Sequence, residues 1–437
     1  MHAGAVLVFD AGPLGLRNGG LDIERVRAYT AAQLAASPRA RQRRVALALG
    51  RLPAWLDDPF FELASHVRHL ALPRPGDERQ LKRLASALLS EPLDRDKPPW
   101  QLVFVEGLDD DRFALIAKAD LALGEGDEGF DPLAALLRAT PNAAFVPMPR
   151  ADTQATPGRV ALLRAELARR ARELARIEAA SDALGSGLRA ALNALERAIT
   201  PRADAPLLGP TGPHRRVEWL ALDESDVRSI ADRLQSSAHA LLLASVAGAL
   251  RAFLARRGLE ADELELRALT PIDAGGESSV FEAPLVALPL AQPDPSARLA
   301  ALAAAPEPRA PDDEGFALLA SLGALHGAAA AARPASLCVM TPSAPPSPRF
   351  LLGCALRECV AFAPLLPGHT LGVAITRCAG RTQLGFAADA ALVADLPLLA
   401  DAVAASFDEL RRLASGEVHQ VRTAADHKAV RNSGAEP

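Results

Sequence analysis

Residue types that carry chemistry or stack on nucleic-acid bases are scarce in this chain. Its 437 residues include nine His, four Cys, one Tyr and three Trp, and aromatic residues make up 4%. Stacking platforms for bases need more aromatic side chains than this. The formal net charge is −5, whereas nucleic-acid-binding proteins usually show a basic excess or a basic stripe. We therefore expect no nucleic-acid partner.

Cysteine usage and apolar runs bear on the compartment. The four cysteines form no C-x-x-C pair, which leaves a zinc site or a thioredoxin-like motif with little support. So few thiols in a long chain fit a reducing cytoplasm. The start of the sequence lacks the pattern of a secretory leader, and the best apolar stretch, residues 240–250, is shorter than the ~20 residues that span a bilayer. We expect a cytoplasmic protein, soluble or peripheral to a membrane.

Strong motifs of enzymes and metal sites are also missing. There is no P-loop, no G-x-S-x-G elbow, no H-E-x-x-H and no G-x-G-x-x-G between a strand and a helix. The Gly-rich loop 124–129 carries three carboxylates, which would repel phosphate, and we interpret it as a solvated turn. His66 and His69 lead into an apolar segment that is typical of a strand, where they would face opposite sides. We therefore expect structural histidines, no metal site and no bound cofactor.

The length predicts two to three structural units. Residues 139–157 and 201–213 are rich in Pro and read as connectors. We predict a first half over 1–150, a linker with amphipathic helices over 151–213, a second half over 214–423 and a disordered tail over 424–437. Strands mixed with helices in both halves predict an α/β or α+β fold. The main elements expected are strands at 5–9, 45–49, 102–106, 113–118, 217–222 and 285–290, helices at 78–89, 130–138, 239–256 and 395–415, and a hairpin at 371–377 and 382–387.

The linker contains a clear amphipathic helix with a basic polar face, residues 159–180. One interpretation is a helix that lies on a membrane surface. The other, which we favour, is a bridging helix with a solvated charged face.

Several segments, in collinear order, resemble the bacterial wax ester synthase/diacylglycerol acyltransferase family. Residues 92–108 (PLDRDKPPWQLVFVEGL) are similar to its Pro-Leu-Asp-Arg-x-x-Pro-Leu-Trp-Glu stretch and the strand that follows. The other similar segments are 66–73 (HVRHLALP), 209–217 (GPTGPHRRV), 244–251 (ASVAGALR), 364–370 (PLLPGHT) and 379–385 (AGRTQLG). Family members usually begin with a further segment before the Met-His-x-Gly found here at residues 1–4, so we expect a late start or a lost segment.

This resemblance implies two chloramphenicol-acetyltransferase-like halves with a tunnel or cleft between them. It implies acyl-CoA as acyl donor and an alcohol or diacylglycerol as acceptor. In the family, the second histidine of a His-His-x-x-x-Asp-Gly motif takes the proton from the acceptor hydroxyl, a task that suits an imidazole.

The aligned segment of this chain departs from that motif. Asp120 stands at the first histidine position and Leu121 at the base position, and a leucine cannot accept a proton. Glu125 keeps the acid with one methylene more, and Gly126 matches. The family's Asn-Asp pair at the start of the buried helix appears here as His239 and an alanine.

Three interpretations follow. The chain is an inactive or impaired family member that keeps the fold for binding an acyl chain. Alternatively, it is an active acyltransferase whose base has moved to Asp120, Glu125 or His239. In the third, it is a scaffold that binds a partner such as an active homologue. By resemblance, a peripheral location at a membrane or at lipid inclusions accompanies the first two.

Overall fold

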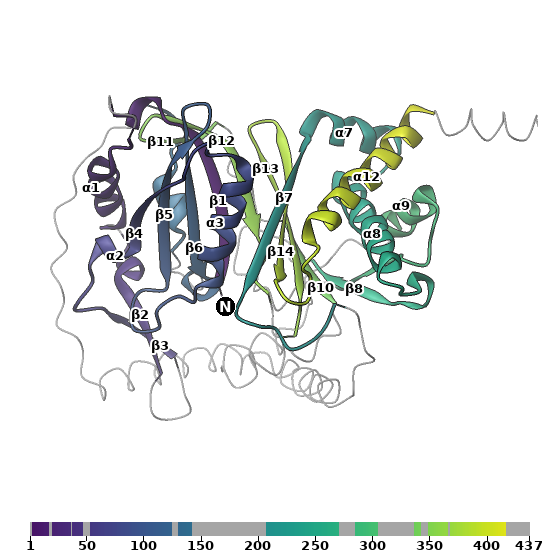
Figure 1. The fold of residues 1–437 in the computed structure, drawn as a ribbon, viewed down its shortest axis with the longest axis horizontal. Coiled ribbons are helices and arrows are strands. Elements are labelled where there is room, and N and C mark those ends of the chain that lie inside the picture. Colours follow the sequence, from purple (N-terminus) through teal and green to yellow (C-terminus); the bar gives the residue numbers. More distant parts are fainter. Residues whose placement is uncertain are drawn as a thin grey trace, which may run out of the picture.

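Two six-stranded sheets form the centre of the two halves (Figure 1). The computed structural model describes residues 2–16, 20–35, 37–46, 53–124, 130–141, 207–270, 285–304, 336–341, 348–365 and 368–416. Glu125, Gly126, the amphipathic helix 159–180, nearly all of the predicted linker, and the tail 424–437 lie outside these residues. The mixed α/β fold predicted from the sequence is confirmed.

The first sheet has the order β11-β12-β1-β6-β5-β4, antiparallel except between β4 and β5. Its strands are β1 (His2–Asp10), β4 (Val67–Ala71), β5 (Trp100–Leu108), β6 (Arg112–Asp120), β11 (Phe350–Leu351) and β12 (Cys354–Phe362). One face packs on α1 (Ile23–Leu34), α2 (Leu63–His66) and α4 (Pro132–Leu136). The other face packs on α3 (Glu78–Ser90). A separate hairpin joins β2 (Gln42–Ala46) and β3 (Pro53–Asp57).

The second sheet has the order β7-β14-β13-β10-β8-β9, with parallel pairs on both sides of β10. Its strands are β7 (Arg215–Asp223), β8 (Leu266–Leu269), β9 (Leu285–Leu288), β10 (Leu337–Met340), β13 (Leu371–Cys378) and β14 (Arg381–Asp389). Its outer face, on the right in Figure 1, is covered by α7 (Glu224–Arg233), α8 (Ala238–Arg256), α9 (Pro295–Ala303) and α12 (Leu396–Ser415).

Local sequence explains why the main elements form. At the start of α3, the Asp77 carboxylate accepts from the Gln80 backbone N–H while the Gln80 side chain accepts from the Asp77 backbone N–H. This capping box satisfies donors that a helix start leaves unpaired. The predicted hairpin is confirmed as β13 and β14, and its turn residues Ala379 and Gly380 both have positive φ, as a tight hairpin turn requires.

One segment of the second half of the chain crosses over into the first half of the structure. Strands β11 and β12 belong by sequence to the predicted second half, yet they hydrogen-bond into the first sheet beside β1. Spatially, the first half therefore includes residues 350–362 as well as the N-terminal elements. The second half of the sequence thus contributes two strands, β11 and β12, to the first sheet.

Side chains of α3 cover the open edge of the second sheet. Among the described residues, strand β7 pairs with β14 on one side only. On its other side the Ser90 hydroxyl accepts from Arg215 N at 2.7 Å and the Ser86 hydroxyl accepts from Val217 N at 3.0 Å. One turn further back, Lys82 Nζ donates to the carbonyl oxygen of Trp219 at 3.1 Å. Four helical residues advance about 6 Å and two strand residues about 6.6 Å, so the two repeats stay in step.

The second sheet covers the outer edge of β12 in the same way. Strand β11 pairs only with the start of β12, and further along the Gln383 side chain accepts from Cys359 N at 2.9 Å. Thr376 Oγ1 donates to the Cys359 carbonyl at 2.6 Å. Gly385 brings the sheets together here, because a methyl group at that position would overlap the carbonyl oxygen of Ala361. Each half thus supplies side-chain partners for an unpaired strand edge of the other.

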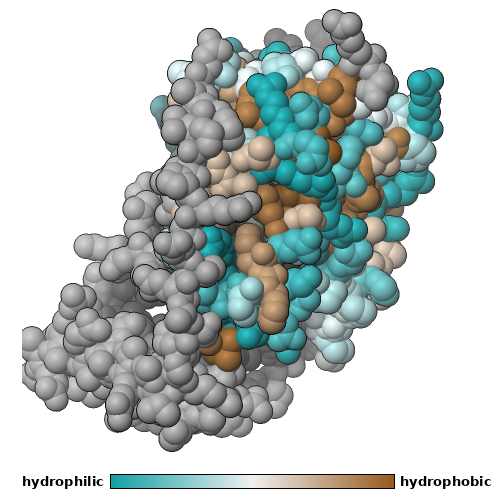
Figure 2. All heavy atoms as spheres, turned by 90° about the vertical axis from the view of Figure 1, so that its left-hand side faces the viewer, coloured by the Kyte–Doolittle hydropathy of each residue, from teal (hydrophilic) through white to brown (hydrophobic). Residues whose placement is uncertain are grey.

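One helix among the described residues, α8, is long and apolar enough to cross a membrane by length and composition. It extends beyond the apolar stretch 240–250 noted in the sequence. Within the protein, 72% of its apolar window is buried, as expected for a core helix. On the opposite side of the molecule, the face that carries α1 shows apolar side chains interspersed with polar ones (Figure 2).

We predict that Gly385→Ala destabilises the protein. The added methyl group would overlap Ala361 O and lie 2.8 Å from Val360 Cγ1, so backbone must shift, and such overpacking costs roughly 1–3 kcal/mol. Gly209→Ala is the matched control, because its new methyl group would meet only Leu392 Cδ1 at 3.8 Å. Denaturant unfolding should separate the two variants, and equal midpoints would contradict the close packing of the sheets.

Candidate functional site

A small cavity lies where the two halves meet, and we call it the inter-half cavity. Its volume is 120 Å³. The first half contributes His2 and Gly4 of β1 and Leu89 of α3. The second half contributes Arg215 and Val217 of β7 and Ala387 of β14. The last residue of β12, Phe362, and residues 363–365 after it close the cavity. The cavity therefore exists only when both halves are in place.

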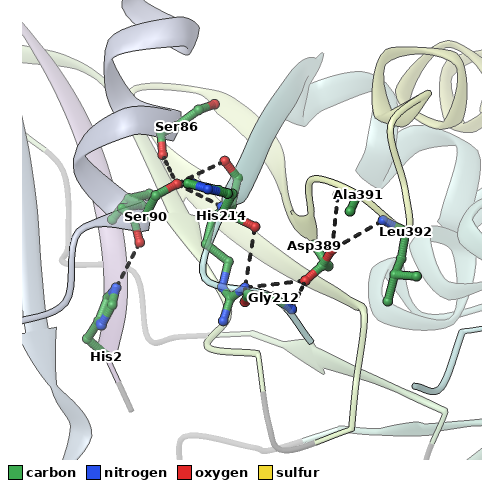
Figure 3. A network of polar contacts seen from close by, with 10 residues as sticks. His2, Ser86, Ser90, Gly212, His214, Asp389, Ala391 and Leu392 are labelled. Carbon is green, nitrogen blue, oxygen red and sulfur yellow. Dashed lines mark hydrogen bonds and ion pairs between the residues drawn. The ribbon is translucent and has the colours of Figure 1, made fainter. Parts of the chain in front are cut away.

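The C-terminal end of α3 explains why basic side chains gather beside this cavity. The last carbonyls of a helix have no partner within the helix. Lys118 Nζ, buried on β6, donates to the carbonyl oxygens of Leu88 at 2.9 Å and Glu91 at 2.8 Å. His2 Nε2 lies 3.0 Å from the Leu89 carbonyl oxygen. Cationic groups are favoured at this end of a helix by its dipole. Figure 3 shows His2 beside Ser90 at the end of α3.

Burial changes the ionisation of both basic groups. The pKa of His2 is lowered, chiefly by burial and also by the charges of Lys118 and Arg215, against the raising effect of the Leu89 carbonyl. Burial also lowers the pKa of Lys118, while Glu91 opposes that shift. His2 is therefore a neutral imidazole at neutral pH.

Arg215 anchors the cavity wall of the second half. Its guanidinium donates to the Gly212 carbonyl at 2.6 Å and lies 3.6 Å from the buried carboxylate of Asp389. Asp389 also accepts from Gly212 N at 2.6 Å and from Ala391 N at 3.0 Å (Figure 3). This network fixes the residues that lead into β7, and with them the position of Arg215.

Asp120 and Leu121, at the positions of the family's two histidines, do not form a catalytic pair. Asp120 ends β6, opposite His2 in the register with β1. Its Oδ1 accepts from Ala122 N at 3.0 Å and lies 3.8 Å from Arg44 Nη1. Leu121, half-buried, opens a short 3₁₀ helix (Leu121–Gly124). The carboxylate of Asp120 is thus engaged in holding this turn, and the next position offers no proton acceptor.

Glu125, another candidate for the base, and the motif glycine Gly126 lie outside the described residues. His239, the remaining candidate, lies elsewhere in the structure. His239 is in the first turn of α8, with Nδ1 3.5 Å from Thr341 Oγ1 at the end of β10. Burial lowers its pKa, and Arg377 lowers it further. His239 is not among the described residues that line the inter-half cavity, so the structure does not bring it together with Asp120.

The remaining titratable residues noted in the sequence have structural contacts. His66 is buried, lies 2.8 Å from the Trp100 carbonyl through Nδ1 and stacks against Trp100 and Phe61. His69 is 3.0 Å from the Glu106 carboxylate. Burial raises the pKa of the Cys338 and Cys359 thiols to about 12, which makes them poor nucleophiles. Within the described ranges, no group of three or more His, Cys, Asp or Glu side chains could hold a metal ion.

Sequence reasoning missed the two ionisable residues of the inter-half cavity. His2 was noted only as part of the first segment, and Arg215 only inside a family-like segment. No local signal distinguishes them, because the cavity is assembled from β1, α3, β7 and the segment after β12. Only the strand pairing of His2 with Asp120 places His2 next to the degenerate motif.

Two sheets joined by a crossover strand, with a cavity where the halves meet, form a two-half chloramphenicol-acetyltransferase-like fold. A solved wax ester synthase/diacylglycerol acyltransferase from Marinobacter aquaeolei VT8 is similar over 95% of both chains, with a TM-score of 0.66 and 20% identity. The first condensation domain of the calcium-dependent antibiotic synthetase is similar over 94% of this chain and 91% of its own, with a TM-score of 0.54 and 14% identity. These similarities concern the fold.

The sequence comparisons identify the family. The wax ester synthase/diacylglycerol acyltransferase catalytic domain matches residues 1–238, and the WS/DGAT C-terminal domain matches residues 316–411. The chain therefore belongs to the wax ester synthase/diacylglycerol acyltransferase (WS/DGAT) family, as its motifs suggested. In Mycobacterium tuberculosis, the probable diacylglycerol O-acyltransferase tgs1 is 30% identical over 259 residues, 56% of this chain and 54% of the relative. The probable diacylglycerol O-acyltransferase tgs3 is 38% identical over 128 residues, 29% of this chain and 45% of the relative. The chain spans about half the length of the curated relatives it matches.

We predict that acid destabilises the protein in part through His66. Its pKa is lowered in the folded chain, mainly by burial, from the value of 6.5 for a free histidine. The unfolded chain then binds more protons below about pH 6.5, so the free energy of unfolding falls as the pH falls through that value. One such histidine contributes at most about 1.4 kcal/mol per pH unit.

The test compares denaturant unfolding of the native chain and of His66→Phe between pH 5 and pH 8. Phenylalanine keeps a ring between Trp100 and Phe61 but cannot be protonated, so its curve should fall less steeply with acid. His214→Gln, at an exposed histidine, should keep the native slope. A native slope in His66→Phe would show that His66 is not charged on unfolding.

Proposed function

We propose that this chain binds acyl-CoA as a WS/DGAT family member but has lost the family's histidine route of acyl transfer. The observation that carries the proposal is Leu121, the residue directly after β6, in the position of the family's base. The similarity to diacylglycerol O-acyltransferases and to a wax ester synthase supports acyl-CoA as donor and an alcohol or diacylglycerol as acceptor.

The chemical consequence follows from the reaction. A hydroxyl group attacks a thioester slowly unless a base removes its proton during the attack, and a positioned base typically contributes 10²–10⁴-fold in rate. Leu121 cannot do this. Asp120 is tied to Ala122 N and lies near Arg44, so its carboxylate is directed into the turn. Binding energy and proximity remain, which supports slow transfer but not family-like turnover.

The setting of this activity is part of the proposal. We place the protein in the cytoplasm, where acyl-CoA is made available, with a peripheral association to membranes or lipid inclusions that hold the acceptor. The reaction itself requires no bound cofactor. Association with an active homologue would let an impaired member deliver or sense acyl groups.

We predict that the native chain binds acyl-CoA while releasing CoA thiol only slowly. Calorimetry with butyryl-CoA and palmitoyl-CoA measures binding, and a thiol-release assay with hexadecanol or diacylglycerol measures turnover. Failure to bind any acyl-CoA would overturn the proposal and favour a partner-binding scaffold. Fast release that is abolished in Asp120→Asn would instead assign the base to Asp120.

We further predict that restoring the motif restores the rate. The triple variant Asp120→His, Leu121→His, Glu125→Asp recreates the family pattern in front of Gly126. If the missing base is the main defect, thiol release should rise by about 10²–10⁴-fold with unchanged acyl-CoA binding. The matched control carries Leu121→Gln with the same two flanking changes, which supplies polarity at position 121 without a base there. A triple variant that binds acyl-CoA yet stays as slow as the control would place the defect in other parts of the site.

A further inference from the structure

The inter-half cavity contains a histidine that the family's route does not use. His2 enters the cavity from the first residues of β1, beside β6, whose last residue Asp120 is its cross-strand partner. Cross-strand partners in an antiparallel pair project from the same face of the sheet. His2 therefore lies next to the strand end that leads to Leu121, although the two are far apart in sequence.

The contact with Leu89 decides which nitrogen of His2 can accept a proton. A carbonyl oxygen only accepts hydrogen bonds, so Nε2, 3.0 Å from Leu89 O, must carry the hydrogen. In the neutral imidazole the other nitrogen, Nδ1, then holds the lone pair. Within the described residues, Nδ1 of His2 has no hydrogen-bond partner. One nitrogen is used to hold the ring at the end of α3, and the second is left as an acceptor.

The surroundings of the ring combine apolar walls with positive charge. Of the described residues that line the inter-half cavity, only His2 and Arg215 ionise, and the rest are apolar, such as Val217 and Phe362. Lys118 faces His2 from β6 and Arg215 from β7, while Glu91, after α3, acts on Lys118. Burial, and to a lesser extent these charges, lower the pKa of His2. A positive charge on the wall stabilises negative charge that develops on a reacting carbonyl oxygen.

We propose that the slow acyl transfer of this chain takes place in the inter-half cavity, with Nδ1 of His2 as the general base. The inference rests on the proposed function, because it assumes that an acyl thioester and a hydroxyl acceptor bind between the halves. It assigns a catalytic role to a residue at the start of β1 rather than to the motif at the end of β6.

The reaction balances with the groups present. The acceptor hydroxyl gives its proton to His2 Nδ1 as its oxygen bonds to the thioester carbonyl carbon. The tetrahedral intermediate then breaks its carbon–sulfur bond, and the departing CoA sulfur takes the proton from Nδ1. The products are an ester and free CoA thiol, and His2 returns to its neutral form. The bond from Nε2 to Leu89 keeps the ring in one orientation throughout.

The size of the cavity limits what reacts there. A volume of 120 Å³ is slightly below the ~150 Å³ of an engineered cavity that holds benzene. It therefore has room for the reacting atoms, the thioester carbonyl and the acceptor hydroxyl, while the acyl chain and the CoA must extend out of it. His2 acts on the reacting atoms, so its effect should be the same for short and long acyl-CoA.

The test uses the full chain and measures thiol release from butyryl-CoA and palmitoyl-CoA with hexadecanol, against a control without protein. In His2→Gln the side-chain amide can still donate to Leu89 O but provides no base. We expect release to fall by about 10² or to the level without protein, with unchanged acyl-CoA binding. His214→Gln, an exposed histidine that does not line the cavity, should keep the native rate.

The pH profile of the rate and rescue by added imidazole distinguish a catalytic role of His2 from a structural one. The native rate should stay level from pH 8 down to about 6.5 and fall only at lower pH, because burial lowers the pKa of His2. In His2→Ala, added imidazole should restore part of the lost rate by occupying the space of the missing ring. A structural role would give neither effect.

The outcomes distinguish this inference from the proposed function. No release above the control in the native chain, or equal release in His2→Gln, would overturn the role of His2 while acyl-CoA binding still stands. If His2→Gln fails to fold, as judged by its thermal unfolding, the pH profile of the native chain and the rescue of His2→Ala decide the question. Loss of acyl-CoA binding in the native chain itself would overturn both.

Discussion

The exchange of side-chain partners between open strand edges is the interaction on which the arrangement of this protein depends. Helix α3 of the first half supplies Ser86 and Ser90 to the unpaired edge of β7. The second sheet supplies Gln383 and Thr376 to the unpaired edge of β12. Unpaired backbone groups that are buried are costly, so each half is complete only against the other. This makes the two halves one structure rather than two domains joined by a linker.

The same contact generates the site. Because α3 runs along β7, its C-terminal end meets the beginning of that strand, and the unpaired carbonyls of the helix end collect Lys118 and His2. The first residues of β7 bring Arg215 to the same point. A helix end whose last carbonyls need hydrogen-bond donors, placed at the junction of two sheets, explains why Lys118 and His2 lie beside the inter-half cavity.

The absence of the motif's two histidines leaves the physical requirements of this junction unchanged. Leu121 changes what the end of β6 can do chemically, but Asp120 still holds the turn through Ala122 N, and α3 still needs its partners. The apolar scaffold and the basic residues around the cavity are needed for folding whether or not the chain turns over substrate. The contact of His2 with the end of α3 therefore does not depend on the residue at position 121.

The sequence by itself determined most of the elements and the family. In helices α3, α8 and α12, and in the hairpin of β13 and β14, the local sequence carries the apolar spacing, caps and turns that determine the element. Even the absence of the family's base was visible, since it depends on a single position, Leu121. The crossover of β11 and β12, the sharing of strand edges and the inter-half cavity were decided by tertiary structure. They bring together residues such as His2, Leu89 and Arg215, whose proximity depends on strand pairing over long sequence separations, and no local propensity records it.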